Sequence, residues 1–354
     1  MNVGTGRSSI KRCPPERSVF APYFHPMKYL VLFSALATFL ACDRATAPHA
    51  EPVAEQHDTL AHDTLLLIGA DTAAGFHFPY YLYIPEGTLS GPQHLLVETN
   101  NTGTNDTLAY HIRGASEQVT NASLGNSLSW GLKVPFLMPA FPRPQTAWQY
   151  YTHALDRDAA MLDTGAMRRL DLQLIAMVEH ARPRLKALGY VVRDKVLLNG
   201  FSASGTFANR FTLLHPDRVA AMACGGINGL AILPVDSLNG SALDYPLGTH
   251  DAEQLFGAAP DTAAFKRVPQ LLYLGALDDN DAVLFDDAYS REEQQVVHTA
   301  IGRPIADRWT QCRNVYVQHK VNASFRTYPG IGHATDRMIY KDVMMFFRAA
   351  MAEE

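Results

Sequence analysis

The chain has 354 residues, of which 47% are hydrophobic and 18% are charged, so it can bury a large core. Its formal net charge is only −5 and no cluster of Lys and Arg stands out after the N-terminal region. Nucleic-acid binding needs clustered cations that displace counterions from phosphates. We therefore expect an ordinary globular protein with no nucleic-acid partner.

The first predicted element is an export signal that begins at Met27. A lysine follows, and then an apolar run over 29–40, which is shorter than the roughly 20 residues that a membrane-spanning helix needs. Such a run is typical of a signal peptide. Its end, Ala41-Cys42, resembles the lipobox of bacterial lipoproteins, so we expect 27–41 to be a lipoprotein-type signal peptide and Cys42 to be lipidated. Plain signal cleavage is the alternative, because a Phe stands where the lipobox usually has Leu.

The segments on either side of this signal are predicted to lie outside the fold. Residues 1–26 are an upstream extension, which we ascribe to a start codon called too early. Residues 42–62 are rich in Ala, Pro, His and acidic residues, and they are predicted to be a flexible tether. The protein is then exported and anchored to a membrane facing the periplasm or the cell exterior, or else secreted, and a lipid at Cys42 is its only expected membrane contact.

From residue 63 to 354, strands and helices alternate, which predicts one α/β domain with a mostly parallel sheet and helices on both faces. The stretch 228–268 interrupts this alternation and is predicted to be an insertion or a cap. The expected strands are 63–68 and 78–85 as an antiparallel pair, then 94–99, 134–141, 195–200, 219–226, 269–275 and 325–330. The expected helices are 170–189, 206–216, 292–302 and 338–351.

The segment Gly200-Phe201-Ser202-Ala203-Ser204-Gly205 carries the chemistry. A Gly-x-Ser-x-small motif between a strand and a helix forms a strained turn that exposes the serine hydroxyl. Gly200 and Ser204 are the small residues that this turn needs around Ser202. Centring the motif on Ser204 would place the β-branched Thr206 at a crowded position, so Ser202 is the predicted nucleophile.

A serine hydroxyl needs a base, and the base needs an acid partner. In a chain with this order of strands and helices, the acid follows the serine and the histidine follows the acid. His333 lies in a Gly-flanked loop after the strand 325–330 and is the predicted base. The loop after 269–275 carries several carboxylates. Asp278 has the usual spacing for the acid that orients the imidazole, and Asp281 is the alternative acid, which would otherwise brace the loop.

Attack by a serine on a carbonyl group puts a negative charge on the carbonyl oxygen, and two backbone N–H groups would stabilise this oxyanion. One is that of Ala203, at the positive end of the following helix. The other is expected after the strand 94–99, at Asn100 or Asn101, although a plain tight turn is an equal interpretation of this run.

These pieces resemble the α/β-hydrolase superfamily, and especially secreted esterases of the depolymerase and feruloyl-esterase kind. The resemblance rests on LLVETNNTG, KVLLNGFSASG, LLYLGALDDND and YPGIGHA, which span about 94–334. It implies an α/β-hydrolase fold and a Ser-His-Asp triad that acts through an acyl-enzyme. Ser204 replaces the glycine that is usual in the motif.

The predicted function is hydrolysis of carboxylic esters, with a small or polymeric ester as substrate and with no metal and no organic cofactor. A serine peptidase of the same fold and a non-catalytic, ligand-binding surface lipoprotein are the alternatives. Residues Phe141 to Trp148 are candidates for a substrate pocket. Arg143 is expected in a surface salt bridge, and contact with a carboxylate substrate is the alternative. Cys224 and Cys312 are left for the folded part, and whether they pair stays open.

Overall fold

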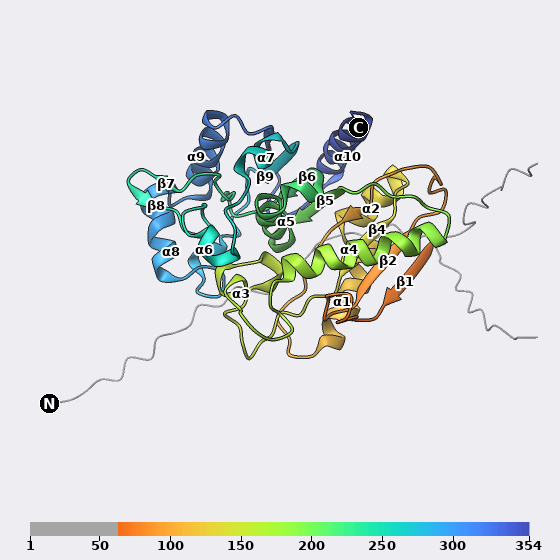
Figure 1. Cartoon of the computed structure of the whole chain (residues 1–354). Helices are drawn as coiled ribbons and strands as arrows, with labels where there is room; N and C mark the ends of the chain where they lie inside the picture. The colour runs from red at the N-terminus through yellow and green to blue at the C-terminus, as the bar shows by residue number, and fades with distance from the viewer. Residues whose placement is uncertain (1–62, 354) are drawn as a thin grey trace, which may run out of the picture.

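The computed structural model describes residues 63–353, which form one mixed sheet covered by helices on both faces (Figure 1). The sheet has eight strands in the order β1-β2-β4-β3-β5-β6-β9-β10. Only the β1–β2 and β2–β4 pairs are antiparallel, and all other neighbours are parallel. The predicted α/β class and the opening antiparallel pair are therefore confirmed. The strands are β1 (Thr64–Ile68), β2 (Tyr80–Ile84), β3 (Leu96–Val97), β4 (Phe136–Pro139), β5 (Val196–Phe201), β6 (Val219–Gly225), β9 (Gln270–Gly275) and β10 (Ala323–Tyr328).

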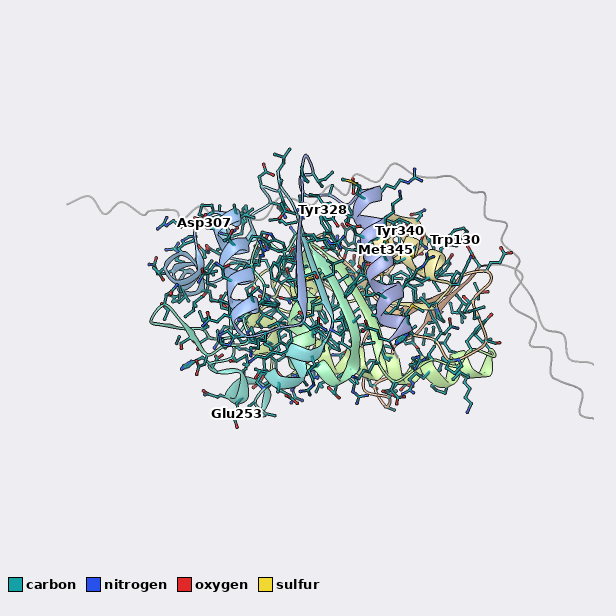
Figure 2. All side chains as sticks on the ribbon, turned by 90° about the horizontal axis from the view of Figure 1, so that it is seen from above. Trp130, Glu253, Asp307, Tyr328, Tyr340 and Met345 are labelled. Atoms are coloured by element: carbon teal, nitrogen blue, oxygen red, sulfur yellow. The ribbon has the colours of Figure 1, made fainter. Side chains whose placement is uncertain are left out.

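The central strands are apolar on both sides, as parallel strands between two helical layers must be. In β5, Leu198 packs into the core on one face of the sheet and Leu197 into the core on the other. The first face is covered by α4 (Leu170–Ala187), α5 (Ala203–Leu214) and α9 (Ile305–Gln318), and the second by α1 (Leu108–Glu117), α2 (Leu124–Leu132) and α10 (Arg337–Ala352). Figure 2 labels Trp130 of α2 beside Tyr340 and Met345 of α10, the helix pair that closes the second face.

Two details differ from the sequence-based expectations, and a third answers the open question of the two cysteines. The strand expected over 94–99 is reduced to the two ladder residues Leu96 and Val97. The helix expected over 292–302 is divided into α8 (Arg291–Val296) and a π-helical turn (Val297–Ile301). Cys224 and Cys312 are both buried and both free.

The stretch 228–268 holds the two-stranded ribbon β7 (Ser237–Leu238) and β8 (Ser241–Ala242), followed by α6 (Ala252–Phe256) and α7 (Thr262–Arg267). It is fastened to the segment before α4, since the hydroxyl of Tyr245 donates to the carbonyl of Leu155 at 2.5 Å. This stretch therefore packs against the segment that follows β4.

Glu98, directly after β3, is a buried carboxyl group that joins three elements. One oxygen accepts the N–H of Gly125, in the first turn of α2, at 3.0 Å, and the same oxygen accepts from the side chain of Asn199 on β5. The first N–H groups of a helix have no acceptor within the helix, so the carboxyl group satisfies one of them. Burial raises the pKa of Glu98 from 4.5 to about 7.

This raised pKa predicts that stability decreases as the pH increases. Between pH 4.5 and 7 the folded state holds a proton on Glu98 that the unfolded chain has lost, so unfolding becomes easier by roughly 3 kcal/mol across this window and then stays level. Denaturant unfolding of wild type and Glu98→Gln between pH 4.5 and 8 measures this contribution as their difference. The exposed Glu117→Gln variant is the control, and a Glu98→Gln profile parallel to wild type would contradict the prediction.

Candidate active site

Ser202 lies on a sharp turn between β5 and α5, at the carboxyl end of the central strands. Its backbone angles are φ 60° and ψ −126°, a region that non-glycine residues rarely enter. The turn is held by the N–H of Ser202, which donates to the carbonyl of Gly225 on β6 at 2.9 Å. Position 200 must be glycine here, because a Cβ would lie 2.3 Å from the carbonyl oxygen of Ser204.

Ser204 has a structural role inside the same turn. Its hydroxyl accepts the N–H of Phe201 at 2.9 Å and donates to the carbonyl of Phe201 at 2.9 Å. Both the donor and an acceptor position of this hydroxyl are thus used by the backbone of the turn. The residue that replaces the usual glycine of the motif therefore fastens the turn on which Ser202 stands.

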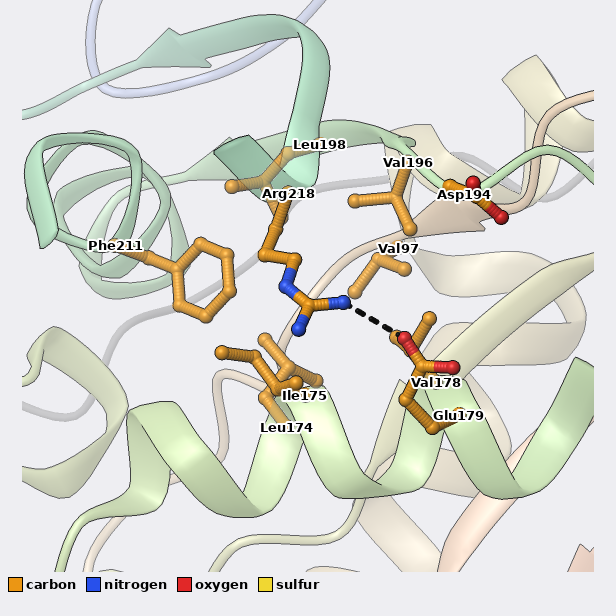
Figure 3. Close-up of a pocket in the computed structure, with 10 residues that line it drawn as sticks. All are labelled: Val97, Leu174, Ile175, Val178, Glu179, Asp194, Val196, Leu198, Phe211 and Arg218. Carbon is orange, nitrogen blue, oxygen red and sulfur yellow. Dashed lines mark hydrogen bonds and ion pairs between the residues drawn. The ribbon is translucent and has the colours of Figure 1, made fainter. Parts of the chain in front are cut away.

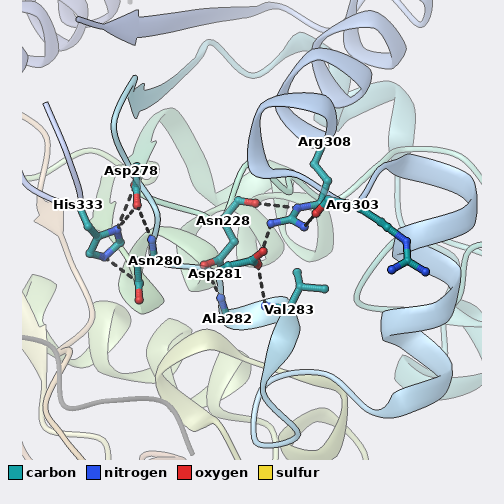
Figure 4. Close-up of polar contacts among 9 residues, drawn as sticks. All are labelled: Asn228, Asp278, Asn280, Asp281, Ala282, Val283, Arg303, Arg308 and His333. Atoms are coloured by element: carbon teal, nitrogen blue, oxygen red, sulfur yellow. Dashed lines mark hydrogen bonds and ion pairs between the residues drawn. The ribbon is translucent and has the colours of Figure 1, made fainter. Parts of the chain in front are cut away.

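His333 and Asp278 meet across the ends of two neighbouring strands, β10 and β9. His333 Nδ1 lies 3.0 Å from both carboxylate oxygens of Asp278 (Figure 4). The Asp278 side chain is only 1% exposed, and it also accepts the N–H of Asn280 at 3.1 Å. The imidazole ring packs against Phe201, the residue before Ser202, with 4.8 Å between ring centroids. The carboxylate therefore fixes the imidazole beside the turn of Ser202.

Asp281, three residues further along, faces away from His333 (Figure 4). It forms a 2.7 Å ion pair with Arg308, whose side chain is fully buried, and it accepts the N–H of Val283 at 3.1 Å. Arg308 in turn donates through Nε to the carbonyl of Asn228 at 3.0 Å. Asp281 thus braces its loop against α9 and against the segment after β6.

Ser202 lines a pocket at the carboxyl ends of β5, β6 and β9. Ala203, at the first position of α5, lines the same pocket, and N–H groups in the first turn of a helix have no acceptor within the helix. Asn280 also lines it, and its amide nitrogen lies 3.2 Å from His333 Nε2. The pocket thus lies between the turn of Ser202 and the loop of Asp278, which contacts His333 through Asn280.

The residues predicted to supply a second oxyanion donor lie in a dense polar network beside this pocket. The N–H of Asn101 donates to Gln118 at 2.9 Å. The side chain of Asn100 is fully buried, and its amide exchanges two 2.9 Å hydrogen bonds with the backbone of Phe141. Because the backbone N–H of Asn101 already donates to Gln118, Asn100 is the favoured source of the second oxyanion donor. The assignment of this donor stays a prediction.

Next to Asn100 lies a histidine that the sequence analysis did not single out. His153 Nε2 lies 2.9 Å from the carbonyl of Phe141 and 3.1 Å from the amide nitrogen of Asn100. Burial lowers the pKa of His153 to about 3. The ring is therefore neutral at ordinary pH, and it serves as a hydrogen-bonding brace for the loop after β3.

Comparison with known proteins adds two solved structures that cover nearly the whole described chain. Poly(aspartic acid) hydrolase-1 from Sphingomonas sp. KT-1 matches at a TM-score of 0.51 and 18% identity, over 82% of this chain and 97% of that one. LpqC, a poly(3-hydroxybutyrate) depolymerase from Bordetella parapertussis, matches at a TM-score of 0.52 and 18% identity, over 83% and 94% of the two chains. No protein-family model and no curated protein matches the sequence.

The chain has the α/β-hydrolase fold. In an α/β-hydrolase, the serine turn lies between a central strand and its helix, and the acid and the histidine come later in the chain. Ser202, Asp278 and His333 occur in this order, after β5, β9 and β10. At 18% identity the likeness concerns the fold, so the roles of these side chains rest on their own geometry.

A second pocket is an apolar gap beneath α4 (Figure 3). Val97 and Val196 line it from the sheet and Leu174 from α4, while an ion pair between Arg218 and Glu179 stands at its edge. None of the predicted site residues lines it. It is therefore a packing gap between a helix and the sheet.

The segment 141–148 was expected to line a substrate pocket and to hold Arg143 in a surface salt bridge. Phe141 is fully buried in the core. Arg143 forms a 3.0 Å ion pair with Asp287, and because both side chains are less than a tenth exposed, the expected surface salt bridge is in fact a buried one. The neighbouring Tyr151, beneath the Arg143 guanidinium, is one of two aromatic residues that line the pocket of Ser202, together with Tyr289.

Some sequence-based predictions lie outside the described residues. These are the extension 1–26, the signal peptide 27–41, the lipidation of Cys42 and the tether 42–62. Within residues 63–353, no helix is both long and apolar enough to span a membrane. In the same range, no group of three or more His, Cys, Asp or Glu side chains is arranged to hold a metal ion.

Proposed function

We propose that this α/β-hydrolase is a serine hydrolase that cleaves carboxylic esters through an acyl-enzyme. The observation that carries the proposal is the bond between His333 Nδ1 and Asp278, made beside a serine turn whose backbone is strained. A non-glycine residue in a sparsely populated backbone region costs of order 1–3 kcal/mol, and such residues cluster at active sites. The structural neighbours support the ester class, since one of them is named a poly(3-hydroxybutyrate) depolymerase.

In the first half of the reaction, the Ser202 hydroxyl oxygen attacks the ester carbonyl carbon while His333 Nε2 takes the hydroxyl proton. The negatively charged oxygen of the tetrahedral intermediate accepts a hydrogen bond from the N–H of Ala203. It is also stabilised by the positive end of the α5 dipole. Collapse of the intermediate breaks the bond to the alcohol, which leaves with the proton from His333. The acyl group then remains on Ser202.

In the second half, water attacks the acyl group while His333 again takes a proton, and the carboxylic acid leaves as the proton returns to Ser202. Asp278 holds the imidazole in the tautomer whose Nε2 can accept a proton, and it stabilises the imidazolium that forms. The near-complete burial of the Asp278 side chain strengthens this interaction, because little solvent screens it.

The nucleophile assignment is tested by replacing Ser202 with Ala. We expect kcat for p-nitrophenyl esters to decrease by about 10⁴–10⁶-fold, because the acyl-enzyme can no longer form. Ser204→Ala is the matched control and should retain turnover within about tenfold, since its hydroxyl only fastens the turn. A fluorophosphonate probe should label wild type at Ser202, whereas a folded wild type that stays unlabelled would favour ligand binding without catalysis.

The acid assignment is tested by comparing Asp278→Asn with Asp281→Asn. The first should lower kcat by about 10³–10⁴-fold with little change in stability, because the imidazole loses its orienting charge. The second should leave kcat within about tenfold but lower the free energy of unfolding by about 3 kcal/mol, because it leaves the buried Arg308 unpaired. Steady-state kinetics and denaturant unfolding measure the two quantities, and the reverse pattern would make Asp281 the acid.

The N-terminal sequence supports export of this enzyme. We infer that residues 27–41 are removed and that Cys42 receives a lipid, on the lipobox-like ending described above. Expression of the full chain in a bacterial host should give a membrane-associated product whose N-terminal peptide, by mass spectrometry, begins at a lipidated Cys42. Cys42→Ala should remove the lipid, and a wild-type product that keeps residues 27–41 would contradict export.

A further inference from the structure

The pocket beside Ser202 contains one feature that ester hydrolysis by itself does not require. Among the described residues that line it, Arg210 is the only one with a charged side chain. The other lining residues are small, aromatic or neutral and polar: Tyr151, Ala154, Ser202, Ala203, Thr206, Asn228, Asn280, Ala282, Ala288 and Tyr289. The wall of this pocket therefore carries an excess positive charge.

Arg210 lies on α5, eight residues after Ser202, and is only 3% exposed. Its Nη1 donates to the carbonyls of Ala154 and Leu155, at 2.9 and 3.3 Å. Its Nη2 donates to the hydroxyl of Tyr289 at 2.9 Å. These three acceptors are all neutral, so they hold the guanidinium in position without cancelling its charge.

The other buried arginines of this region have carboxylate partners. Arg308 is paired with Asp281 at 2.7 Å, and Arg143 with Asp287 at 3.0 Å. For Arg210, no carboxylate oxygen of residues 63–353 lies within the 4.0 Å of an ion pair. Arg210 is thus a fixed, buried cation whose counter-charge the described chain does not supply at contact distance.

The carboxyl groups whose charge interacts with Arg210 are Asp156 and Glu293. Burial raises the pKa of Asp156 to about 8 and also raises the pKa of Glu293. Asp156 instead uses its side chain to accept the N–H of Ala159 at 3.0 Å, at the start of a helical turn. Neither carboxyl group forms an ion pair with Arg210, so each acts on the guanidinium only over a longer distance.

A buried charge without a counter-ion is costly, because it has lost water and gained little in return. A carboxylate on the substrate would remove this cost on binding, and the planar guanidinium matches its geometry. From the position of Arg210 in the wall of the nucleophile's pocket, we propose that it binds a free carboxylate of the substrate, so that the preferred substrates are esters carrying a second, ionised carboxyl group. This inference rests on the proposed ester hydrolysis and names its substrate class.

Wild type tests the substrate class without any mutation. The probes are the methyl half-esters of succinic, glutaric and adipic acid, each matched with the neutral analogue whose free carboxyl is an amide. The acetate esters of glycolic and 3-hydroxypropionic acid, with their amides, place the carboxylate on the alcohol side instead. We expect a preference when the carboxylate lies on the correct side of the ester, acyl or alcohol, and at the correct chain length. For that pair, kcat/KM measured with a pH-stat should be about 10- to 100-fold higher for the carboxylate than for its amide. The absence of such a preference in every pair would overturn the proposal.

Variants then test whether Arg210 is responsible. Arg210→Gln should abolish the preference, so that within this variant kcat/KM for each carboxylate and for its amide differ by less than about threefold, and Arg210→Lys should keep part of the preference, because the charge remains. Arg218→Gln is the matched control, since it removes the same charge from a partly exposed side chain that does not line this pocket. An undiminished preference in folded Arg210→Gln would overturn the assignment to this residue.

Binding to Ser202→Ala separates this proposal from the proposed function. Calorimetry on this variant should show the half-ester binding about 10- to 100-fold more tightly than its amide, and Ser202→Ala/Arg210→Gln should lose the difference. If wild type hydrolyses none of the probes but this binding preference is present, ester hydrolysis fails and the carboxylate site stands. If hydrolysis depends on Ser202 but neither turnover nor binding shows the preference, the carboxylate site fails and ester hydrolysis stands.

Discussion

The turn at Ser202 is the constraint on which the rest of the site depends. A φ of 60° at a non-glycine residue is unfavourable, so the surroundings must supply the energy that keeps it. They do so through the bond from Ser202 N–H to Gly225, the two bonds of the Ser204 hydroxyl, and an approach at Gly200 too close for any side chain. These contacts tie the serine to two central strands and to the start of α5.

Around this turn, the loops at the carboxyl ends of the strands are held by buried polar bonds. Arg308 joins the loop after β9 to α9 and to Asn228, while Asn100 and His153 join the loop after β3 to Phe141. Such bonds are directional, and breaking one leaves a buried group unsatisfied. They hold each loop in one position, as a site made of side chains from separate strands requires. Arg210 differs from this pattern because its acceptors are all neutral and it faces the pocket.

The strands of the main sheet and the helices α4, α5 and α10 were predictable because their signals are local. Apolar runs of four to eight residues indicated the central strands, and the helical pattern after Leu170 indicated α4. The helices α1, α2 and α9 were not predicted. Gly114, Gly125 and Gly131 weaken the helical signal of α1 and α2, and α9 carries charged and polar residues through much of its length. These three helices are stabilised chiefly by packing on the sheet, which no short window of sequence contains.

The sequence by itself determined the serine turn, because its small residues and the flanking strand and helix lie within about 20 positions of one another. It also determined the order of Ser202, Asp278 and His333 along the chain, since each directly follows a recognisable strand. Only the tertiary structure decided that Asp278 rather than Asp281 contacts His333, because Arg308, distant in sequence, takes the second carboxylate. It alone also placed Arg210 in the pocket, since that position depends on how α5 packs against the segments of Ala154 and Tyr289. Local patterns specify backbone geometry, whereas the pairing of side chains from distant segments depends on how the whole core packs.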